Sequence, residues 1–131
     1  MHLGKTGVGP RWMRTMSFSR GDVVLVLFPD SNLRTAKRRP ALVVQADNLG
    51  TGLQQTLVAM ITSNMARTGH LSRVEVRQAS PLGQQMGLRT DSVIMTDNLA
   101  TVREIEVDCI IGHAIDMEST DSALRSTLGL Q

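Results

Sequence analysis

Lys37-Arg38-Arg39-Pro40-Ala41-Leu42-Val43-Val44 is the stretch that decides the fold, because a basic cluster leads directly into an apolar and β-branched run. Proline has no backbone N–H, which suits the first residue of a strand, so we predict a strand that begins at Pro40. The polar and basic segment 31–39 before it is predicted to be a loop. Proline also biases Arg39 toward an extended backbone, which constrains the direction of that side chain before any tertiary contact forms.

Six other segments have the composition or the alternation of β-strands. Most are apolar and β-branched runs of strand length, and one alternates valines with charged residues as a half-exposed strand does. The predicted strands are Val23–Phe28, Leu57–Thr62, Arg73–Arg77, Ser92–Met95, Leu99–Val102 and Cys109–Ala114. The stretch Gly83–Gly87, which precedes Ser92, is predicted to be a turn.

The chain closes with a helical pattern over Met117–Leu128, which Asp116 can cap and Gly129 can end. Short strands followed by one helix indicate a mainly β fold, a small and strongly bent barrel or sheet. We expect one domain, residues 17–131, because 131 residues with 41% hydrophobic content can bury a core without disulfides or metal. Residues 1–16 show no periodicity and are predicted to be a flexible leader or an upstream start.

The single cysteine lies in an apolar stretch, so we expect Cys109 to be a buried, inert thiol. In extended backbone, Cys109 and His113 are spaced too widely to share an ion, and no further ligand pair accompanies them. We therefore expect no metal and no cofactor. No run reaches the roughly 18 apolar residues of a membrane span, so a membrane is not an expected partner.

The formal net charge is only +2, but the charge is unevenly distributed. Residues 1–39 carry eight Lys or Arg against two Asp or Glu, and the remainder carries six against ten. Such asymmetry permits a basic surface that attracts a polyanion, although a basic tail on an ordinary surface explains it equally well. Aromatic residues are scarce, so a nucleic acid would be held by arginine, backbone and hydroxyl groups rather than by base stacking.

Two features together indicate a phosphodiester site. Arg39 offers a guanidinium fork that can pair with phosphate oxygens, and Thr62 and Ser63 place hydroxyls at the end of the apolar run Leu57–Ile61. Structural roles stay open, since an arginine can anchor a loop through a carboxylate and hydroxyls can simply end a strand. We expect solvated charges at Arg34, Lys37, Arg38 and Arg67, with phosphate steering as a secondary role.

Taken in order along the chain, a series of short stretches resembles the MazF/PemK family of toxin endoribonucleases. The series covers nearly everything from Arg20 onward and is more specific than any one of its members. The matching stretches are Arg20-Gly21-Asp22-Val23-Val24-Leu25-Val26, Arg39-Pro40-Ala41-Leu42-Val43-Val44, Ile61-Thr62-Ser63, Gly87-Leu88-Arg89-Thr90-Asp91-Ser92-Val93-Ile94, Asp97-Asn98-Leu99-Ala100-Thr101-Val102 and the tail from Ile111-Gly112 to Gly129-Leu130.

The resemblance implies an SH3-like small barrel of the CcdB/MazF/PemK type with a C-terminal α-helix, assembled as a homodimer. It further implies a cytoplasmic toxin of a type II toxin–antitoxin system that cleaves single-stranded RNA or mRNA sequence-selectively without metal. A cognate acidic antitoxin is the implied partner, and DNA is contacted only indirectly through it. Some members carry arginines at the positions of Met95 and Ala100.

Two other functions stay open. One is a non-catalytic SH3-like module that binds RNA or protein. The other is a gyrase-poisoning toxin on the same fold, which depends on a tryptophan-containing C-terminal tail. This chain ends in Leu128-Gly129-Leu130-Gln131 and has its only tryptophan at Trp12, which makes the gyrase-poisoning function the weaker alternative.

The family's catalytic arginine, which directly precedes proline, falls on Arg39, and its catalytic hydroxyl falls on Thr62. In metal-free cleavage the neighbouring 2′-hydroxyl attacks the phosphorus, and Arg39 would stabilise the growing charge while Thr62 orients a non-bridging oxygen. Asp97 is the candidate general base, on condition that its pKa is raised, and a cap of the following turn is its structural alternative. The predicted RNA-binding residues are Lys37, Arg38, Ser63 and Arg67.

Overall fold

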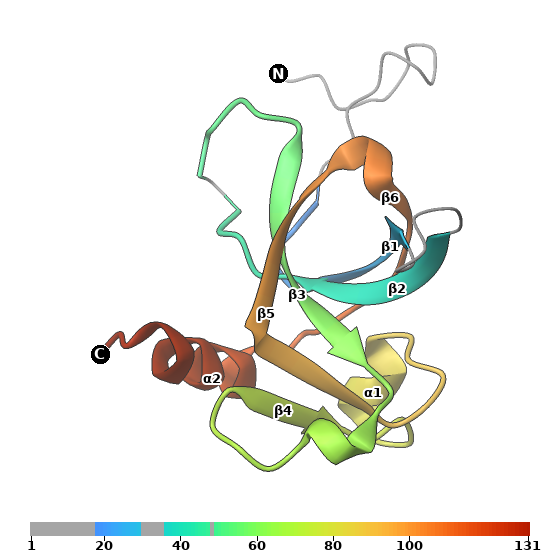
Figure 1. Cartoon of the computed structure of the whole chain (residues 1–131), viewed down its shortest axis with the longest axis vertical. Coiled ribbons are helices and arrows are strands. Elements are labelled where there is room, and N and C mark those ends of the chain that lie inside the picture. Colours follow the sequence, from blue (N-terminus) through green and yellow to red (C-terminus); the bar gives the residue numbers. More distant parts are fainter. Residues whose placement is uncertain (1–17, 30–35, 48) are drawn as a thin grey trace.

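The computed structural model describes residues 18–29, 36–47 and 49–131, which form one antiparallel sheet with two helices (Figure 1). The predicted leader, residues 1–16, lies outside the described residues. The strands are β1 (Asp22–Pro29), β2 (Ala36–Val43), β3 (Gln55–Thr62), β4 (Arg73–Val76), β5 (Ser92–Arg103) and β6 (Val107–His113). The helices are α1 (Pro81–Gln85) and α2 (Glu118–Leu128), and the short 3₁₀ turns are η3 (Met65–Arg67) and η4 (Glu104–Glu106).

The sheet has the strand order β4-β5-β3-β2-β1-β6, and every neighbouring pair is antiparallel. β4 and β6 are its two edges and are not paired with each other, so the sheet is bent and barrel-like without being closed (Figure 1). The predicted small, mainly β barrel with a C-terminal helix is confirmed. Each end of β1, β3, β4 and β6 lies within two residues of its predicted position.

Both faces of the sheet are buried, because neighbouring residues along a strand belong to two different apolar clusters. In β2, Leu42 packs into one cluster, while Ala41 and Val43 pack into the other. The first cluster also contains Met86, directly after α1, and packs against Leu124 of α2, so both helices cover that face. This two-sided burial explains why the strands have nearly continuous apolar runs.

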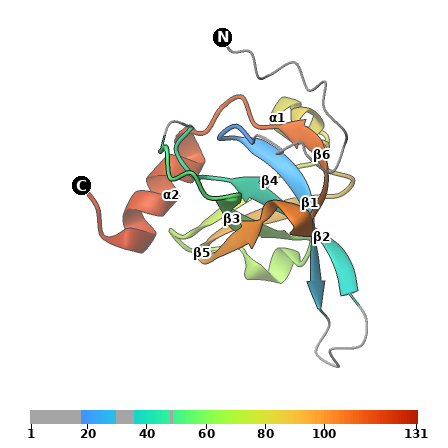
Figure 2. The same ribbon diagram turned by 90° about the horizontal axis from the view of Figure 1, so that it is seen from above.

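β2 begins earlier than predicted, at Ala36 instead of Pro40. Residues 36–40 pair with β1 alone, since the pairing of β2 with β3 starts only at Ala41. Pro40 therefore has no strand neighbour on one side, where its missing N–H leaves no ladder bond unmade. This segment and the end of β1 form a two-stranded arm that extends from the sheet (Figure 2). The predicted loop is wrong for residues 36–39, and residues 31–35 lie outside the described part of the chain.

The predicted turn over residues 83–87 is wrong for residues 83–85, which belong to α1, whereas residues 86 and 87 do form a turn. The hydroxyl oxygen of Ser80 accepts the backbone N–H of Gly83 at 3.0 Å, and a proline opens the helix. A side-chain carbon at Gly112 would clash with the backbone of Met86, so the end of α1 lies directly against β6. This close approach fixes where the connection from α1 to β5 begins.

The predicted strands Ser92–Met95 and Leu99–Val102 are a single strand of 12 residues, β5. In its pairing with β3, Met60 is opposite Met95 while Ala59 is opposite Leu99, so the register shifts between these pairs. Residues 96–98 are left without partners in β3, and such a bulge interrupts the alternation of faces. The sequence pattern therefore breaks into two pieces although the strand is continuous.

The terminal helix agrees with its prediction. The Asp116 carboxylate accepts the N–H of Glu118 at 2.9 Å, and Gly129 ends α2 in the left-handed conformation with φ +70°. The hydroxyls of buried Thr96 and of Thr127 are joined by a hydrogen bond of 2.7 Å, which ties α2 to β5. Neither α2 nor any other described helix is long and apolar enough to cross a membrane.

Cys109 is exposed, so the prediction of a buried thiol is wrong. The residue lies on β6, which is an edge strand and pairs only with β1. The neighbouring Ile110 is exposed as well, with 46% of its surface accessible. Apolar sequence neighbours indicate burial only where another layer covers the strand, and this part of β6 has none in the described structure.

Candidate functional site

The register of β2 and β3 explains how Arg39 and Thr62 come to face the same opening. Ala41 pairs with Met60, and the same antiparallel register continued two residues outward sets Arg39 opposite Thr62. No ladder pair between β2 and β3 forms at these outer positions. The two strands diverge there, so the opening between them is bounded by Arg39 on one side and by Thr62 on the other.

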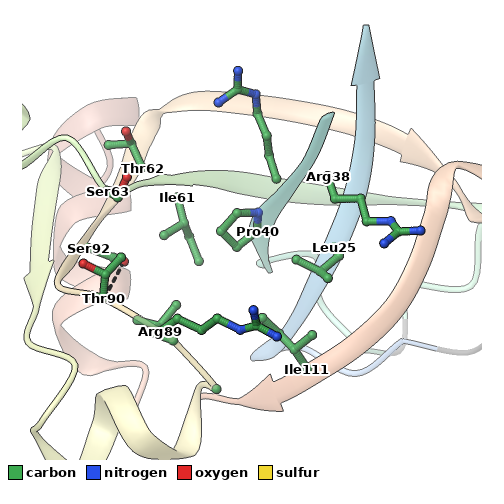
Figure 3. Close-up of a pocket in the computed structure, with 13 residues that line it drawn as sticks. Leu25, Arg38, Pro40, Ile61, Thr62, Ser63, Arg89, Thr90, Ser92 and Ile111 are labelled. Carbon is green, nitrogen blue, oxygen red and sulfur yellow. Dashed lines mark hydrogen bonds between the residues drawn. The ribbon is translucent and has the colours of Figure 1, made fainter. Parts of the chain in front are cut away.

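A cavity of about 760 Å³ lies at this opening (Figure 3). Its size falls in the range typical of ligand pockets in proteins. Four predicted site residues share it, with apolar side chains from β1, β2, β3 and β6 between and around them. The lining residues are Leu25, Arg38, Arg39, Pro40, Ile61, Thr62, Ser63, Gly87, Leu88, Arg89, Thr90, Ser92 and Ile111.

A second cavity, of about 380 Å³, meets the first at Arg39 and Thr62, which line both. The predicted RNA-binding residue Arg67 belongs to this second cavity. Met95 and Ala100, at positions where some MazF/PemK members carry arginine, give it an apolar wall. Its other lining residues are Met60, Ile61, Asn64 and Asn98.

The polar groups at the junction of the two cavities are available to a ligand. Among the described residues, Arg39 has no ion-pair or hydrogen-bond partner, whereas Arg38 lies 3.1 Å from the carboxylate of Asp108. The hydroxyl oxygen of Thr62 accepts the backbone N–H of Asn64 at 3.1 Å. The hydroxyl hydrogen is then left to donate to a bound oxygen. An unpaired guanidinium and a hydroxyl donor that line the same cavities suit a phosphate group.

The described residues place no carboxylate and no imidazole in the lining of either cavity. Over the same part of the chain, no three His, Cys, Asp or Glu side chains gather closely enough to hold a metal ion. The lining groups offer positive charge and hydrogen-bond donors instead of an ordinary general base. Such groups can stabilise negative charge that develops on a phosphate during a reaction.

Asp97 lies outside both linings, as does Lys37. Within the bulged segment 96–98, Asn98 lines the second cavity, while Asp97 pairs with Arg73 of β4 through hydrogen bonds of 2.7 and 2.9 Å. The hydrogen bond from Arg73 lowers the pKa of the Asp97 carboxyl. The raised pKa on which a general-base role depends is therefore contradicted.

The structure adds polar residues that local sequence did not single out, namely Arg89, Thr90 and Ser92 of the first cavity. The hydroxyl of Ser92 donates to the backbone carbonyl of Thr90 at 2.9 Å, which holds the connection between α1 and β5 in place. The signal in the sequence was an Arg-Thr pair directly after Gly87 and Leu88. That pattern is weak, because it also describes an ordinary surface turn.

Fold and site together define a small, mainly β protein whose barrel-like sheet opens at one end onto unpaired arginines and hydroxyls. Residues 19–128 match the family described as PemK-like, MazF-like toxin of type II toxin-antitoxin system, and the chain belongs to this family. No curated protein sequence matches the chain.

Solved structures share the fold over most of this chain. "Endoribonuclease from Mycobacterial species" has a TM-score of 0.65 at 21% identity and covers 88% of this chain and 95% of its own. "Endoribonuclease in complex with its cognate antitoxin from Mycobacterial species" has a TM-score of 0.64 at 22% identity, covering 86% and 96%. The MazE-MazF structure (Form-II) from Deinococcus radiodurans has a TM-score of 0.64 at 19% identity, covering 88% and 99%.

Proposed function

We propose that this toxin is a metal-independent, sequence-selective endoribonuclease that cleaves single-stranded RNA, including mRNA. The observation that carries the proposal is the pair Arg39 and Thr62 at the junction of two cavities, with no other described residue occupying the guanidinium. Solved structures with the same fold are described as endoribonucleases, and one of them is held by its cognate antitoxin. Family membership and site chemistry thus support the same activity.

In the proposed reaction the ribose 2′-hydroxyl attacks the adjacent phosphorus. A bond forms between the 2′-oxygen and phosphorus, and the bond from phosphorus to the 5′-oxygen breaks. The 2′-hydroxyl gives up its proton to solvent and the leaving 5′-oxygen takes one up, so the products carry a 2′,3′-cyclic phosphate and a 5′-hydroxyl. Arg39 donates to the phosphorane oxygens on which charge grows, and it stays protonated at neutral pH. One such preorganised donor contributes about 10²–10³ in rate.

Thr62 orients the phosphate in this mechanism. Its hydroxyl oxygen accepts the N–H of Asn64, so its hydrogen stays free to donate to a non-bridging oxygen. Ser63 and Arg38 line the same cavity and assist in binding the RNA backbone, and Arg67 does so from the second cavity. Asp97 receives a positioning role in this proposal, because its pairing with Arg73 fixes the bulge that presents Asn98.

The proposed partners follow from the charge of the site. An acidic, flexible antitoxin segment would bind the unpaired arginines as it orders and would occlude the RNA. We also propose a homodimer, a cytoplasmic location, and contact with DNA only through the antitoxin. The predicted leader 1–16 and single domain 17–131 stay proposals of the same kind.

The test is RNA cleavage by the purified chain in the presence of a chelator, with the ends of the products mapped. The native chain should leave cyclic phosphate and 5′-hydroxyl ends, and Arg39→Ala should slow cleavage by about 10²–10³. Arg125→Ala is the matched control, because Arg125 is an exposed arginine of α2 that lines neither cavity. Cleavage by Arg39→Ala at close to the native rate overturns the mechanism, and RNA binding without turnover by the native chain would favour a non-catalytic module.

A further inference from the structure

The arginines without partners are not scattered over the surface. Five of the nine described arginines are ion-paired with carboxylates: Arg20, Arg38, Arg73, Arg77 and Arg103. Among the described residues, no partner is found for the guanidinium groups of the other four, which are Arg39, Arg67, Arg89 and Arg125. Three of these four line the two cavities that meet at Thr62. Arg39 and Arg67 are already accounted for by the proposed function, and Arg89 is not.

The backbone that carries Arg89 is held firmly on both sides. Before it, Leu88 is buried with 7% of its surface accessible, and its N–H donates to the carbonyl of Gly83 at 3.2 Å. After it, the carboxylate of Asp91 accepts the N–H of Gln78 at 2.8 Å. The connection is therefore anchored by its neighbours, while the Arg89 side chain is exposed and unpaired within the described structure. A fixed backbone with a free guanidinium is pre-organised for a ligand.

The position of Arg89 in the first cavity is opposite to that of the proposed catalytic hydroxyl. In Figure 3, Arg89 extends along the side of the cavity away from Thr62, with Ile61 and Pro40 in the space between them. The cavity thus has Thr62 and Ser63 on one side, the Arg89 guanidinium on the other, and apolar side chains between them. A nucleotide has the matching parts, because its base presents an apolar face and phosphates lie on either side of its ribose.

We propose that Arg89 binds a second RNA phosphate, the one next to the scissile phosphate, so that the first cavity holds one nucleotide step. The base of that nucleotide lies over the apolar middle of the cavity, and its two flanking phosphates contact Arg39 and Arg89. This inference rests on the proposed function and adds a backbone-binding residue to the same site. Because a phosphate contact carries no sequence information, Arg89 contributes affinity for RNA of any sequence.

The experiment uses an RNA made uncleavable by a single 2′-deoxy nucleotide at the mapped cleavage position. A set of such RNAs carries one uncharged methylphosphonate at each linkage in turn, and the Kd of each is measured for the native chain and for Arg89→Ala. The native chain should lose affinity when the scissile linkage or one adjacent linkage is neutral. Arg89→Ala should bind the charged RNA about tenfold or more weakly and be insensitive at that adjacent linkage alone.

Two further readouts separate binding from structural damage. Arg89→Ala should flatten the dependence of log affinity on log salt by about 0.7, the value for one phosphate of a single strand. With cleavable RNA it should raise KM and leave kcat nearly unchanged. Arg89→Lys should retain part of the affinity, and Arg125→Ala, which removes an unpaired arginine far from the lining, should match the native chain.

Equal Kd values for Arg89→Ala and the native chain, or an unchanged methylphosphonate profile, would overturn the role of Arg89. If Arg89→Ala fails to fold by circular dichroism, Arg89→Gln carries the same test, because it keeps a polar chain and removes the charge. A native chain that binds RNA but cleaves none contradicts the proposed nuclease, and the Kd values of the native chain and of Arg89→Ala for unmodified RNA then test the role of Arg89 in binding. A native chain that binds no RNA contradicts both proposals.

Discussion

Two regions of the β-sheet, the β4 edge and the opening between β2 and β3, use arginine in opposite ways. At the β4 edge, Arg73 is bound by the carboxylate of Asp97 and also donates to the backbone carbonyl of Arg67 at 2.9 Å. At the opening between β2 and β3, Arg39 and Arg89 have no described partner. A guanidinium whose donors are satisfied within the chain holds structural elements together, and an unsatisfied one is free for a ligand. For Arg39, Arg73 and Arg89, the pairing state of the guanidinium separates these two roles.

The carboxyls with shifted pKa values lie near the β4–β5 edge of the sheet. The Asp97 carboxyl has a lowered pKa because of the hydrogen bond from Arg73, and the Asp91 carboxyl has a lowered pKa chiefly because it accepts the Gln78 N–H and then because of Arg77. Both carboxyls lie outside the two cavities. Perturbed titration often marks a functional site, but in this molecule it marks ion pairs that stabilise the β4–β5 edge.

The largest effect is expected at the cavities, where the arginines have no partner in the described structure. Arg39→Ala should reduce kcat by about 10²–10³, because it removes a charge-stabilising donor. Thr62→Val should reduce kcat by about tenfold, the value of one neutral hydrogen bond. Because both residues act on the same phosphate, the double variant should lose less than the product of the two factors. Single-turnover cleavage of labelled RNA in chelator measures all three, and strictly multiplicative losses would contradict a shared phosphate.

A smaller effect is expected where α1 packs against β6. Gly112→Ala would force a side-chain carbon into the backbone of Met86, which should cost about 1–3 kcal/mol in the free energy of unfolding. The end of α1 also carries the connection to Arg89, so RNA affinity should fall together with stability. Denaturant unfolding and RNA titration of the same variant measure the two quantities.

Gly129→Ala is the matched control for that change. Gly129 has φ +70° and nothing within 4 Å of an added side-chain carbon, so alanine there should cost about 1–2 kcal/mol from backbone strain alone. Its RNA affinity should equal that of the native chain. If Gly112→Ala loses stability but keeps native RNA affinity, the position of the α1–β5 connection does not matter for RNA binding.

Elements of this fold could be predicted where a local sequence pattern covers the whole helix or strand. The alternation in Arg73–Val76 and the terminal Gly129 cap are local signals, so β4 and α2 were predictable. The start of β2 was not predictable. Proline is also tolerated inside a strand that has a neighbour on one side only, and the sequence does not show that residues 36–40 pair with β1 alone. The exposure of Cys109 has the same origin, since an edge position cannot be read from apolar neighbours.

The candidate site divides in the same way. Arg39 and Thr62 could be predicted because each stands at the end of a strong apolar run, and the β2–β3 register then sets them opposite each other. Asp97 could not be judged from sequence, because its environment depends on the bulge at residues 96–98 and on the approach of Arg73 from another strand. Arg89 was equally hidden, since its significance lies in the absence of a partner.

The smallest expected effect lies at the β4–β5 edge and concerns stability. Asp97→Asn should lower the free energy of unfolding by about 0.5–1 kcal/mol at pH 7, as expected for a partly exposed ion pair. The folded-state pKa of Asp97 lies below its unfolded value of about 3.9, so the native pair stabilises the fold above that pH. This stabilisation is lost as the pH falls through the lowered pKa. Denaturant unfolding of both proteins should therefore show different stabilities at pH 7 that converge in acid.

The same variant also tests whether Asp97 takes part in catalysis or only stabilises the β4–β5 edge. If Asp97 serves the β4–β5 edge, Asp97→Asn should cleave RNA with a kcat within about twofold of the native value, since an amide keeps the shape of the carboxylate and no proton passes through it. A general base contributes about 10²–10⁴ in rate, so a loss of that size would return Asp97 to the catalytic site. Measuring kcat and the free energy of unfolding on one preparation distinguishes the two cases. Loss of the ion pair at the β4–β5 edge lowers stability with little change in kcat, whereas loss of a general base lowers kcat.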